Sequence, residues 1–133
     1  MDLFQLIDQF GPAITSRVLD TYPPLYQPGS ETLPLHRLKR RPIGRQADAI
    51  GAVVHSLRCQ RGTLLVGEMG VGKTTIAASA AYLAGFERIL VMCPPGLTKK
   101  WKREVEDTVP GAAALIVRNI TDLERLRSHH HGG

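Results

Sequence analysis

The sequence predicts an α/β fold: a three-layer domain with a mainly parallel sheet, preceded by a helical extension. Three observations predict it. Short apolar runs alternate with segments of helical periodicity from residue 45 onward. One of these runs leads through a glycine-rich segment, residues 67–74, directly into a helix. Hydrophobic residues make up 43% of the chain and aromatic residues 5%, so an aliphatic core is expected.

The N-terminal part of the chain predicts a helix followed by a connector. Apolar side chains recur at spacings of three and four over residues 2–21, but Gly11 and Pro12 interrupt the pattern. Since proline removes a helical hydrogen bond, one broken helix or two short ones are expected there. Five prolines between residues 22 and 44, without a sustained period, then predict an extended connector.

The rest of the chain is expected to alternate strands and helices in one domain, which is all that 133 residues allow. The strands are continuous apolar runs at 63–66, 88–93 and 113–117. The helices are amphipathic or alanine-rich and lie at 45–58, 73–84 and 97–107. A last short helix is expected to open with a capping box, Thr121 and Glu124. The expected division is an extension with its connector at 1–34, a domain at 35–128 and a disordered tail at 129–133.

Composition and charge exclude some classes of protein. No apolar run is long enough to span a membrane and the chain does not start with a basic secretory signal, so a cytoplasmic protein without membrane contact is expected. Cys59 and Cys93 lie far apart and do not have CxxC spacing, which disfavours a disulfide or zinc site, and both are expected to be buried thiols. The formal net charge is +5. Two basic clusters suit a polyanion or, equally, a solvated surface: Arg37, Lys39, Arg40, Arg41 and Arg45, then Lys99, Lys100, Lys102 and Arg103.

The glycine-rich segment has the spacing of a phosphate-binding loop. Its residues, Gly67-Glu68-Met69-Gly70-Val71-Gly72-Lys73-Thr74, fit G-x-x-x-x-G-K-[ST] between an expected strand and an expected helix. Glycines lack Cβ atoms, so backbone N–H groups turn inward around an anion, and the helix dipole adds positive potential. Lys73 is expected to reach the β- and γ-phosphates of a nucleotide and Thr74 to bind Mg²⁺, with Thr75 as a helper. The alternative is a glycine-rich turn without a ligand.

Two further segments narrow the interpretation. Arg45 and Gln46 begin the helix before the loop, and the run ILVMC is followed by PPGLTKKWKRE at residues 94–104. Together with GEMGVGKT, this pattern resembles the first RecA-like domain of superfamily 2 helicases, especially the Swi/Snf-like DNA translocases, over residues 35–118. The resemblance implies a partial RecA-like P-loop NTPase domain that binds ATP and Mg²⁺ and contacts nucleic acid, expected to be DNA.

The resemblance also implies roles for single residues. Gln46 is expected to read adenine, although a lone solvated glutamine is an open alternative. The residues expected to hold the nucleotide are Gln46, Gly67, Glu68, Met69, Gly70, Val71, Gly72, Lys73, Thr74 and Thr75. The residues expected to contact the nucleic-acid backbone are Pro94, Lys99, Lys100, Lys102 and Arg103. Trp101 is expected to pack in the core rather than stack on a base.

The acidic box of this family, DExx, is missing from the sequence. In the family it follows an apolar strand and serves Mg²⁺ and the attacking water, whereas Asp122 and Glu124 lie in an expected helix. The strands that would flank 63–66 come after that box, so this strand is expected to lack its neighbours. We therefore expect ATP binding with feeble hydrolysis, and whether the chain acts as an enzyme stays open. The alternatives are a non-catalytic half-domain that docks onto a separately encoded helicase remainder or onto DNA, and a complete small P-loop protein of another kind.

Overall fold

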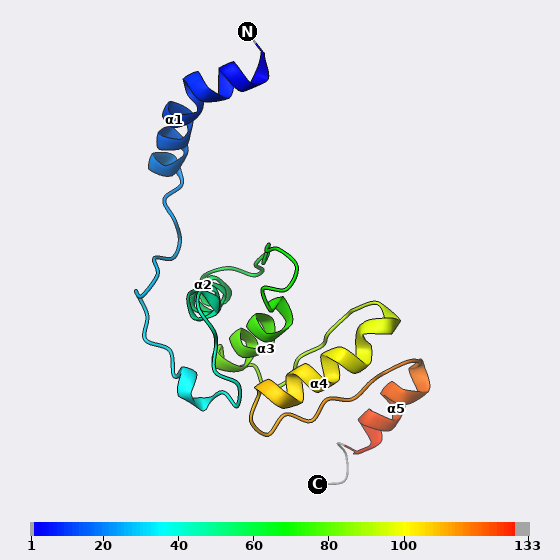
Figure 1. The fold of residues 1–133 in the computed structure, drawn as a ribbon. Helices are drawn as coiled ribbons and strands as arrows, with labels where there is room; N and C mark the ends of the chain where they lie inside the picture. The colour runs from blue at the N-terminus through cyan, green and yellow to red at the C-terminus, as the bar shows by residue number, and fades with distance from the viewer. Residues whose placement is uncertain (1, 130–133) are drawn as a thin grey trace.

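The computed structural model describes residues 2–129, and over this range the chain is helical (Figure 1). It forms five α-helices and two short 3₁₀ turns, with no strand between residues 2 and 129. The α-helices are α1 (Leu3–Thr21), α2 (Gln46–Cys59), α3 (Lys73–Leu83), α4 (Thr98–Thr108) and α5 (Ile120–His129). The 3₁₀ turns are η1 (Leu35–Arg37) and η2 (Pro95–Leu97). None of the helices described here has both the length and the apolar character that crossing a membrane requires.

The predicted parallel sheet is wrong, and with it the three-layer RecA-like architecture. The segments 63–66, 88–93 and 113–117 are extended, but none of them makes a backbone–backbone hydrogen bond with another part of residues 2–129. A β-strand needs a neighbouring strand, because its backbone N–H and C=O groups form hydrogen bonds with those of the neighbour. Many of the side chains are open to solvent, with Leu64 87% and Leu90 81% exposed, whereas Leu65 packs against the core. The apolar composition of a strand is present, but the pairing that makes a strand is not.

The core lies between α2 and α3, and both of these predicted helices are confirmed. Its buried members are Ile50 and Val54 from α2 and Ile76 and Ala80 from α3, each at most 3% exposed. Burying a valine or isoleucine side chain contributes about 1.5–3 kcal/mol. With so few members, the core depends on each of them.

The connector folds back onto two helices. Tyr26 packs against Gly51 in the middle of α2, where a Cβ atom would collide with the tyrosine hydroxyl. Farther along, Leu38 is buried and the Lys39 N–H donates to the carbonyl of Thr108 at the end of α4 (3.0 Å). The connector therefore joins α2 to α4.

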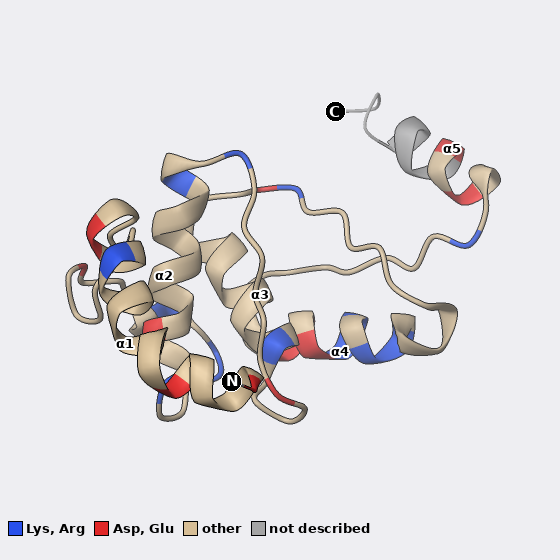
Figure 2. Cartoon of the chain, turned by 90° about the horizontal axis from the view of Figure 1, so that it is seen from above, with Lys and Arg blue, Asp and Glu red and all other residues tan. Residues whose placement is uncertain are grey.

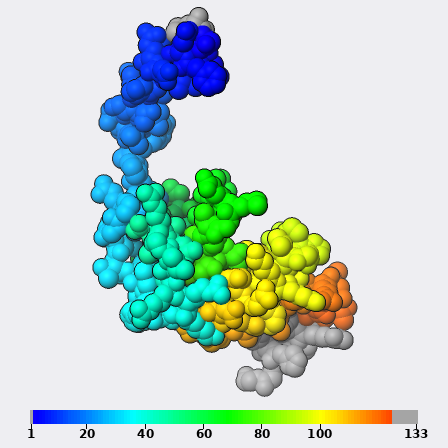
Figure 3. Space-filling view, in the orientation of Figure 1, coloured from blue at the N-terminus to red at the C-terminus, as the bar shows by residue number. Residues whose placement is uncertain are grey.

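α1 is a single helix, so the predicted break at Gly11 and Pro12 is wrong. Pro12 lies inside it, and the helix axis bends along its length (Figure 1). Loss of one backbone hydrogen bond at proline bends a helix without ending it when the flanking turns are sound. The first turn is held by a capping box between Asp2 and Gln5. No residue of α1 is buried, and the helix stands apart from the rest of the molecule (Figure 3).

The end of the described chain differs from the prediction in its cap. Asn119 accepts a hydrogen bond from the Asp122 N–H (3.0 Å), and α5 begins at Ile120. The cap is therefore Asn119, and the predicted capping box at Thr121 and Glu124 is wrong, because Thr121 is already helical. The predicted tail at 129–133 lies outside the described residues, except for His129, which ends α5.

Candidate functional site

The loop before α3 has the backbone conformation that only glycine adopts without strain. Gly70 and Gly72 have φ angles of 87° and 82°, in the left-handed region. A Cβ atom on Gly72 would also lie 2.6 Å from Nε2 of Gln46. The first turn of α3 has no side-chain cap, so its backbone N–H groups face the loop without a side-chain acceptor. An anion would satisfy these groups.

Lys73 closes the loop on itself. Its ammonium donates to the carbonyl oxygens of Gly67 (2.8 Å) and Glu68 (2.7 Å), six and five residues before it. The ammonium thus lies at the start of the loop, while its backbone stands at the first position of α3. An incoming phosphate would compete with these two carbonyls for the same donor group.

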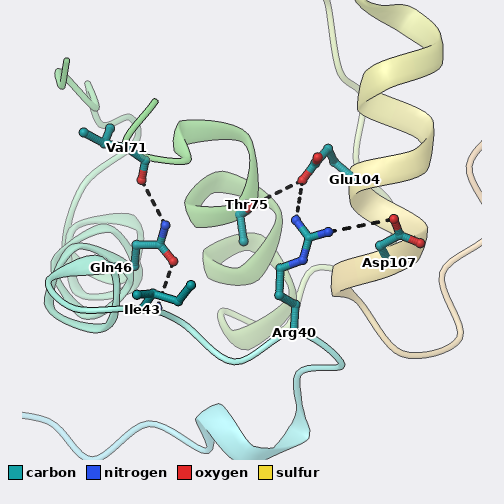
Figure 4. Close-up of polar contacts among 7 residues, drawn as sticks. All are labelled: Arg40, Ile43, Gln46, Val71, Thr75, Glu104 and Asp107. Carbon is teal, nitrogen blue, oxygen red and sulfur yellow. Dashed lines mark hydrogen bonds and ion pairs between the residues drawn. The ribbon is translucent and has the colours of Figure 1, made fainter. Parts of the chain in front are cut away.

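Gln46 lies against the loop, and both ends of its amide contact backbone (Figure 4). Nε2 donates to the carbonyl of Val71 (3.0 Å), and Oε1 accepts from the N–H of Ile43 (3.0 Å). The side chain therefore links the connector to the last turn of the loop. This arrangement gives Gln46 a positioning role in the structure, whereas adenine reading stays an expectation that rests on the resemblance.

The two threonines after Lys73 have different surroundings. Thr74 is half-buried, whereas Thr75 is only 6% exposed and its hydroxyl donates to Glu104 of α4 (3.2 Å). Glu104 in turn accepts from Arg40 (2.8 Å), which also lies 3.9 Å from Asp107 (Figure 4). The Thr75 hydroxyl is thereby engaged with the packing of α3 on α4.

The remaining loop residues are open to solvent. Met69 is 96% exposed, and Glu68 and Val71 are exposed too. Their backbone, rather than their side chains, forms the surface that a ligand would meet.

The predicted nucleic-acid contacts gather at η2 and α4. Pro94 is exposed just before η2, and Lys99, Lys100 and Arg103 are exposed along α4. Lys102 differs, because its ammonium donates to Glu106 (2.6 Å) and to the carbonyl of Ala114. Figure 2 shows basic and acidic residues side by side along this helix. Trp101, on the same helix, is half-buried and is not a member of the core cluster between α2 and α3.

Glu106 is the acidic partner of this helix. The Lys102 ammonium and then the backbone N–H of Ala114 (3.1 Å) hold the pKa of Glu106 below its usual value of 4.5, because both bond the charged form. The carbonyl of Glu106 also accepts from the Lys39 ammonium (2.7 Å). Lys39 and Lys102, from the two basic clusters that suit a polyanion or a solvated surface, thus serve the contact between the connector, α4 and the segment after it.

Sequence reasoning missed the network of Arg40, Glu104 and Thr75. Arg40 and Glu104 are 64 residues apart, and no local pattern marks them as partners. The Arg40 side chain is 44% exposed and the Glu104 side chain 21%, so solvent screens the pair and its contribution is about 0.2–1 kcal/mol. The pair fixes where the basic connector lies beside α4.

Comparison with known proteins gives a partial likeness. No family model matches the chain, and no solved structure does. Chromodomain-helicase-DNA-binding protein 1-like from Mus musculus is 37% identical over 76 residues, which cover 53% of this chain and 8% of that protein. The chain is therefore related in sequence to a short part of a helicase-type protein.

Proposed function

We propose that residues 67–74 bind the phosphates of ATP together with Mg²⁺, in a protein of helicase-related origin. The observation that carries this proposal is the left-handed backbone at Gly70 and Gly72, which opens the loop directly before the uncapped first turn of α3. The ammonium of Lys73 is within the loop and transfers from two carbonyls to the phosphates. Thr74 supplies a hydroxyl to Mg²⁺. The partial likeness to a helicase supports the choice of ATP.

The chain is proposed to bind ATP with little turnover. Hydrolysis in P-loop proteins needs a carboxylate for Mg²⁺ and a group that orients water. The carboxylate of Glu104, which contacts α3 through Thr75, is held by Arg40 and Thr75. Asp122 lies in α5 and accepts from the N–H of Arg118 (3.0 Å). Neither carboxylate is free to serve a metal ion at the loop without breaking these contacts.

The exposed cations of α4 are proposed to bind DNA phosphates. Lys99, Lys100 and Arg103 are exposed on one helix, and the related mouse protein is named as DNA-binding. Such contacts position a duplex without reading its sequence. A Lys99→Glu, Lys100→Glu double variant is expected to bind duplex DNA more weakly at low salt, and its salt dependence should be flatter by about 0.9 for each phosphate that is no longer neutralised. Fluorescence anisotropy over a salt series measures this; an unchanged slope removes these lysines from the interface.

The ATP proposal is tested by calorimetry with Mg²⁺ and ATP on the whole chain. Lys73→Ala is expected to weaken binding by about tenfold to a hundredfold, the value of one charged hydrogen-bonding group. Lys99→Ala is the matched control, because it removes a lysine outside the loop and is expected to leave ATP binding unchanged. Equal affinity of Lys73→Ala and the unaltered chain, with both shown to be folded by circular dichroism, would falsify the assignment.

A second candidate function is docking onto a separately encoded helicase remainder. Large apolar side chains are exposed in all three extended segments, which is unusual for a surface without a partner; examples are Leu64, Leu90 and Leu115. Co-expression with a helicase fragment that lacks the region related to this chain tests it. A stable complex that Leu64→Lys and Leu90→Lys abolish supports docking, whereas no complex at micromolar concentrations argues against it.

A further inference from the structure

A cysteine, a histidine and a glutamate lie together at the C-terminal end of α2. Cys59 is the last residue of α2 and is exposed, so the predicted burial of this thiol is wrong; Cys93 is half-buried. His55 stands one turn earlier, with Nε2 3.7 Å from the Cys59 sulfur. α2 has 14 residues, so Cys59 is about 20 Å from Gln46 and the phosphate-binding loop. This cluster therefore belongs to a different part of the molecule.

Glu31 fixes which nitrogen of His55 faces the thiol. Oε1 of Glu31 lies 2.5 Å from Nδ1 of His55, and Oε2 accepts from Arg58 (3.1 Å). An ionised carboxylate only accepts hydrogen bonds, so Nδ1 of a neutral His55 carries the proton. The lone pair of Nε2 then points to the sulfur of Cys59, which is the orientation a general base needs.

The surroundings shelter the histidine and leave the sulfur accessible. The side chains of His55 and Glu31 are 27% and 26% exposed, and the ring of Tyr26 lies against His55 with centroids 6.0 Å apart. Cys59 itself stands at the C-terminal end of a helix, where the helix dipole opposes a negative charge. His55 is consequently the group that must favour the thiolate, and removing it should remove the activation.

We propose that Cys59 is a nucleophilic thiol that forms mixed disulfides with small anionic disulfides of the glutathione type. In this step Nε2 of His55 takes the thiol proton, and the sulfur attacks one sulfur of the disulfide. The S–S bond breaks, and the departing thiolate takes up the proton from His55 and leaves as a thiol. One disulfide is consumed and one is formed, so no other oxidant is needed. Glu31 is a positioning residue that acts through His55.

The charges around Cys59 favour an anionic disulfide. Arg58 precedes it in the chain and Arg61 follows two residues later, and both are exposed. Arg58 is already paired with Glu31, whereas the side chain of Arg61 has no hydrogen bond or ion pair with any part of residues 2–129 that the structure describes. The carboxylates of a glutathione-type disulfide suit this basic surface, and a cationic disulfide such as cystamine does not.

The experiment measures the reaction of the whole chain with two probes. Iodoacetamide, which is neutral, reports the reactivity of the thiolate, and oxidised glutathione reports the disulfide exchange; peptide mass spectrometry assigns each product to Cys59 or Cys93. We expect Cys59 to react faster than Cys93 with both probes, and Cys59→Ser to abolish the product at this position. His55→Ala is expected to slow the iodoacetamide reaction of Cys59 by about tenfold at neutral pH.

The pH dependence separates a proton relay from a structural effect. If His55 acts as the base, the rate difference between His55→Ala and the unaltered chain disappears at alkaline pH, where solvent removes the Cys59 proton in either protein. If His55 has a merely structural role, His55→Ala reacts more slowly at every pH. Glu31→Gln keeps an acceptor for Nδ1 and should fall between the two. Should His55→Ala not fold, His55→Gln takes its place.

The choice of disulfide has its own control. Arg61→Ala is expected to slow exchange with oxidised glutathione and to leave the iodoacetamide rate unchanged. Two results overturn the proposal: equal iodoacetamide rates with and without His55 at neutral pH, or no mixed disulfide at Cys59 with oxidised glutathione. Neither result bears on ATP binding, which depends on the other end of α2.

Discussion

Gln46 offers a sharp test of how the loop is held, because the sequence and the structure give it different roles. The resemblance to helicases implies that its amide reads adenine. In the structure the same amide donates to Val71 in the loop and accepts from Ile43 in the connector. The two roles predict different ligand dependence for the variant Gln46→Ala.

The magnitude follows from the two hydrogen bonds. Each contributes about 1 kcal/mol net. The Ile43 N–H belongs to an exposed residue, and water can replace its partner, so its loss falls mainly on the connector. The bond to Val71 reaches the loop, so about 1 kcal/mol of loop ordering is lost, which is about a fivefold fall in affinity. If Gln46 acts through the loop, this fall is the same for every ligand that uses the loop.

The assay compares three ligands by calorimetry in the presence of Mg²⁺: ATP, GTP and inorganic tripolyphosphate. We expect Gln46→Ala to weaken all three by a similar factor, since all three meet the same backbone groups. Gln60→Ala is the matched control, because Gln60 is an exposed glutamine just past the other end of α2. It should change none of the affinities.

One result would refute the positioning argument. If Gln46→Ala weakens ATP alone and leaves GTP and tripolyphosphate unchanged, the amide reads the base and the bond to Val71 does not order the loop. Gln46→Glu adds a second check. It keeps the acceptor for Ile43 and loses the donor to Val71, so it should weaken tripolyphosphate at least as much as Gln46→Ala.

Three further predictions concern stability. Ile50→Ala should cost about 2–5 kcal/mol in urea unfolding, because it opens a cavity in a very small core, whereas Ile14→Ala, at a 57% exposed position on α1, should stay within about 0.5 kcal/mol; equal effects would contradict the core assignment. Deleting residues 2–21 should leave the thermal midpoint of the remainder unchanged, since no residue of α1 is buried, and a lower midpoint would reveal a contact that the structure lacks. Glu106→Gln should destabilise the fold near neutral pH, and its free energy of unfolding should converge with that of the unaltered chain in acid. The reason is that the folded-state pKa of Glu106 lies below 4.5. The stability that the carboxylate contributes is therefore complete above that pH and is lost as the pH falls through the folded-state pKa. A difference in urea midpoint that does not shrink as the pH is lowered would speak against this linkage.

The sequence predicted what depends on neighbours along the chain. The helices α2 and α4 follow from periodic side chains within one segment and α3 follows from its alanine content, while the backbone turns at Gly70 and Gly72 follow from the glycines themselves. The prediction of strands was wrong because an apolar run such as 63–66 is not sufficient to form a strand. Whether a second segment pairs with this run depends on residues far from it in the sequence.

The site shows the same division. The spacing of the loop placed Lys73 at the start of α3, and the structure agrees. The partners of Gln46 and Arg40 required the path of the connector, which no local pattern describes. Cys59 was expected to be buried but is exposed, in agreement with the polar residues Arg58, Gln60 and Arg61 that flank it in the sequence.

Two carbonyl groups of the loop compete with the ligand for the ammonium of Lys73. The hydrogen bonds from the lysine to the carbonyls of Gly67 and Glu68 must break before the ammonium can bind a phosphate, so every ligand carries the same free-energy cost. A single phosphate group returns little more than it displaces, whereas a row of phosphates can meet the ammonium and the first turn of α3 at once. We therefore expect the affinity of the loop to rise with the number of phosphates in the ligand, whatever its base, and monophosphates to bind most weakly.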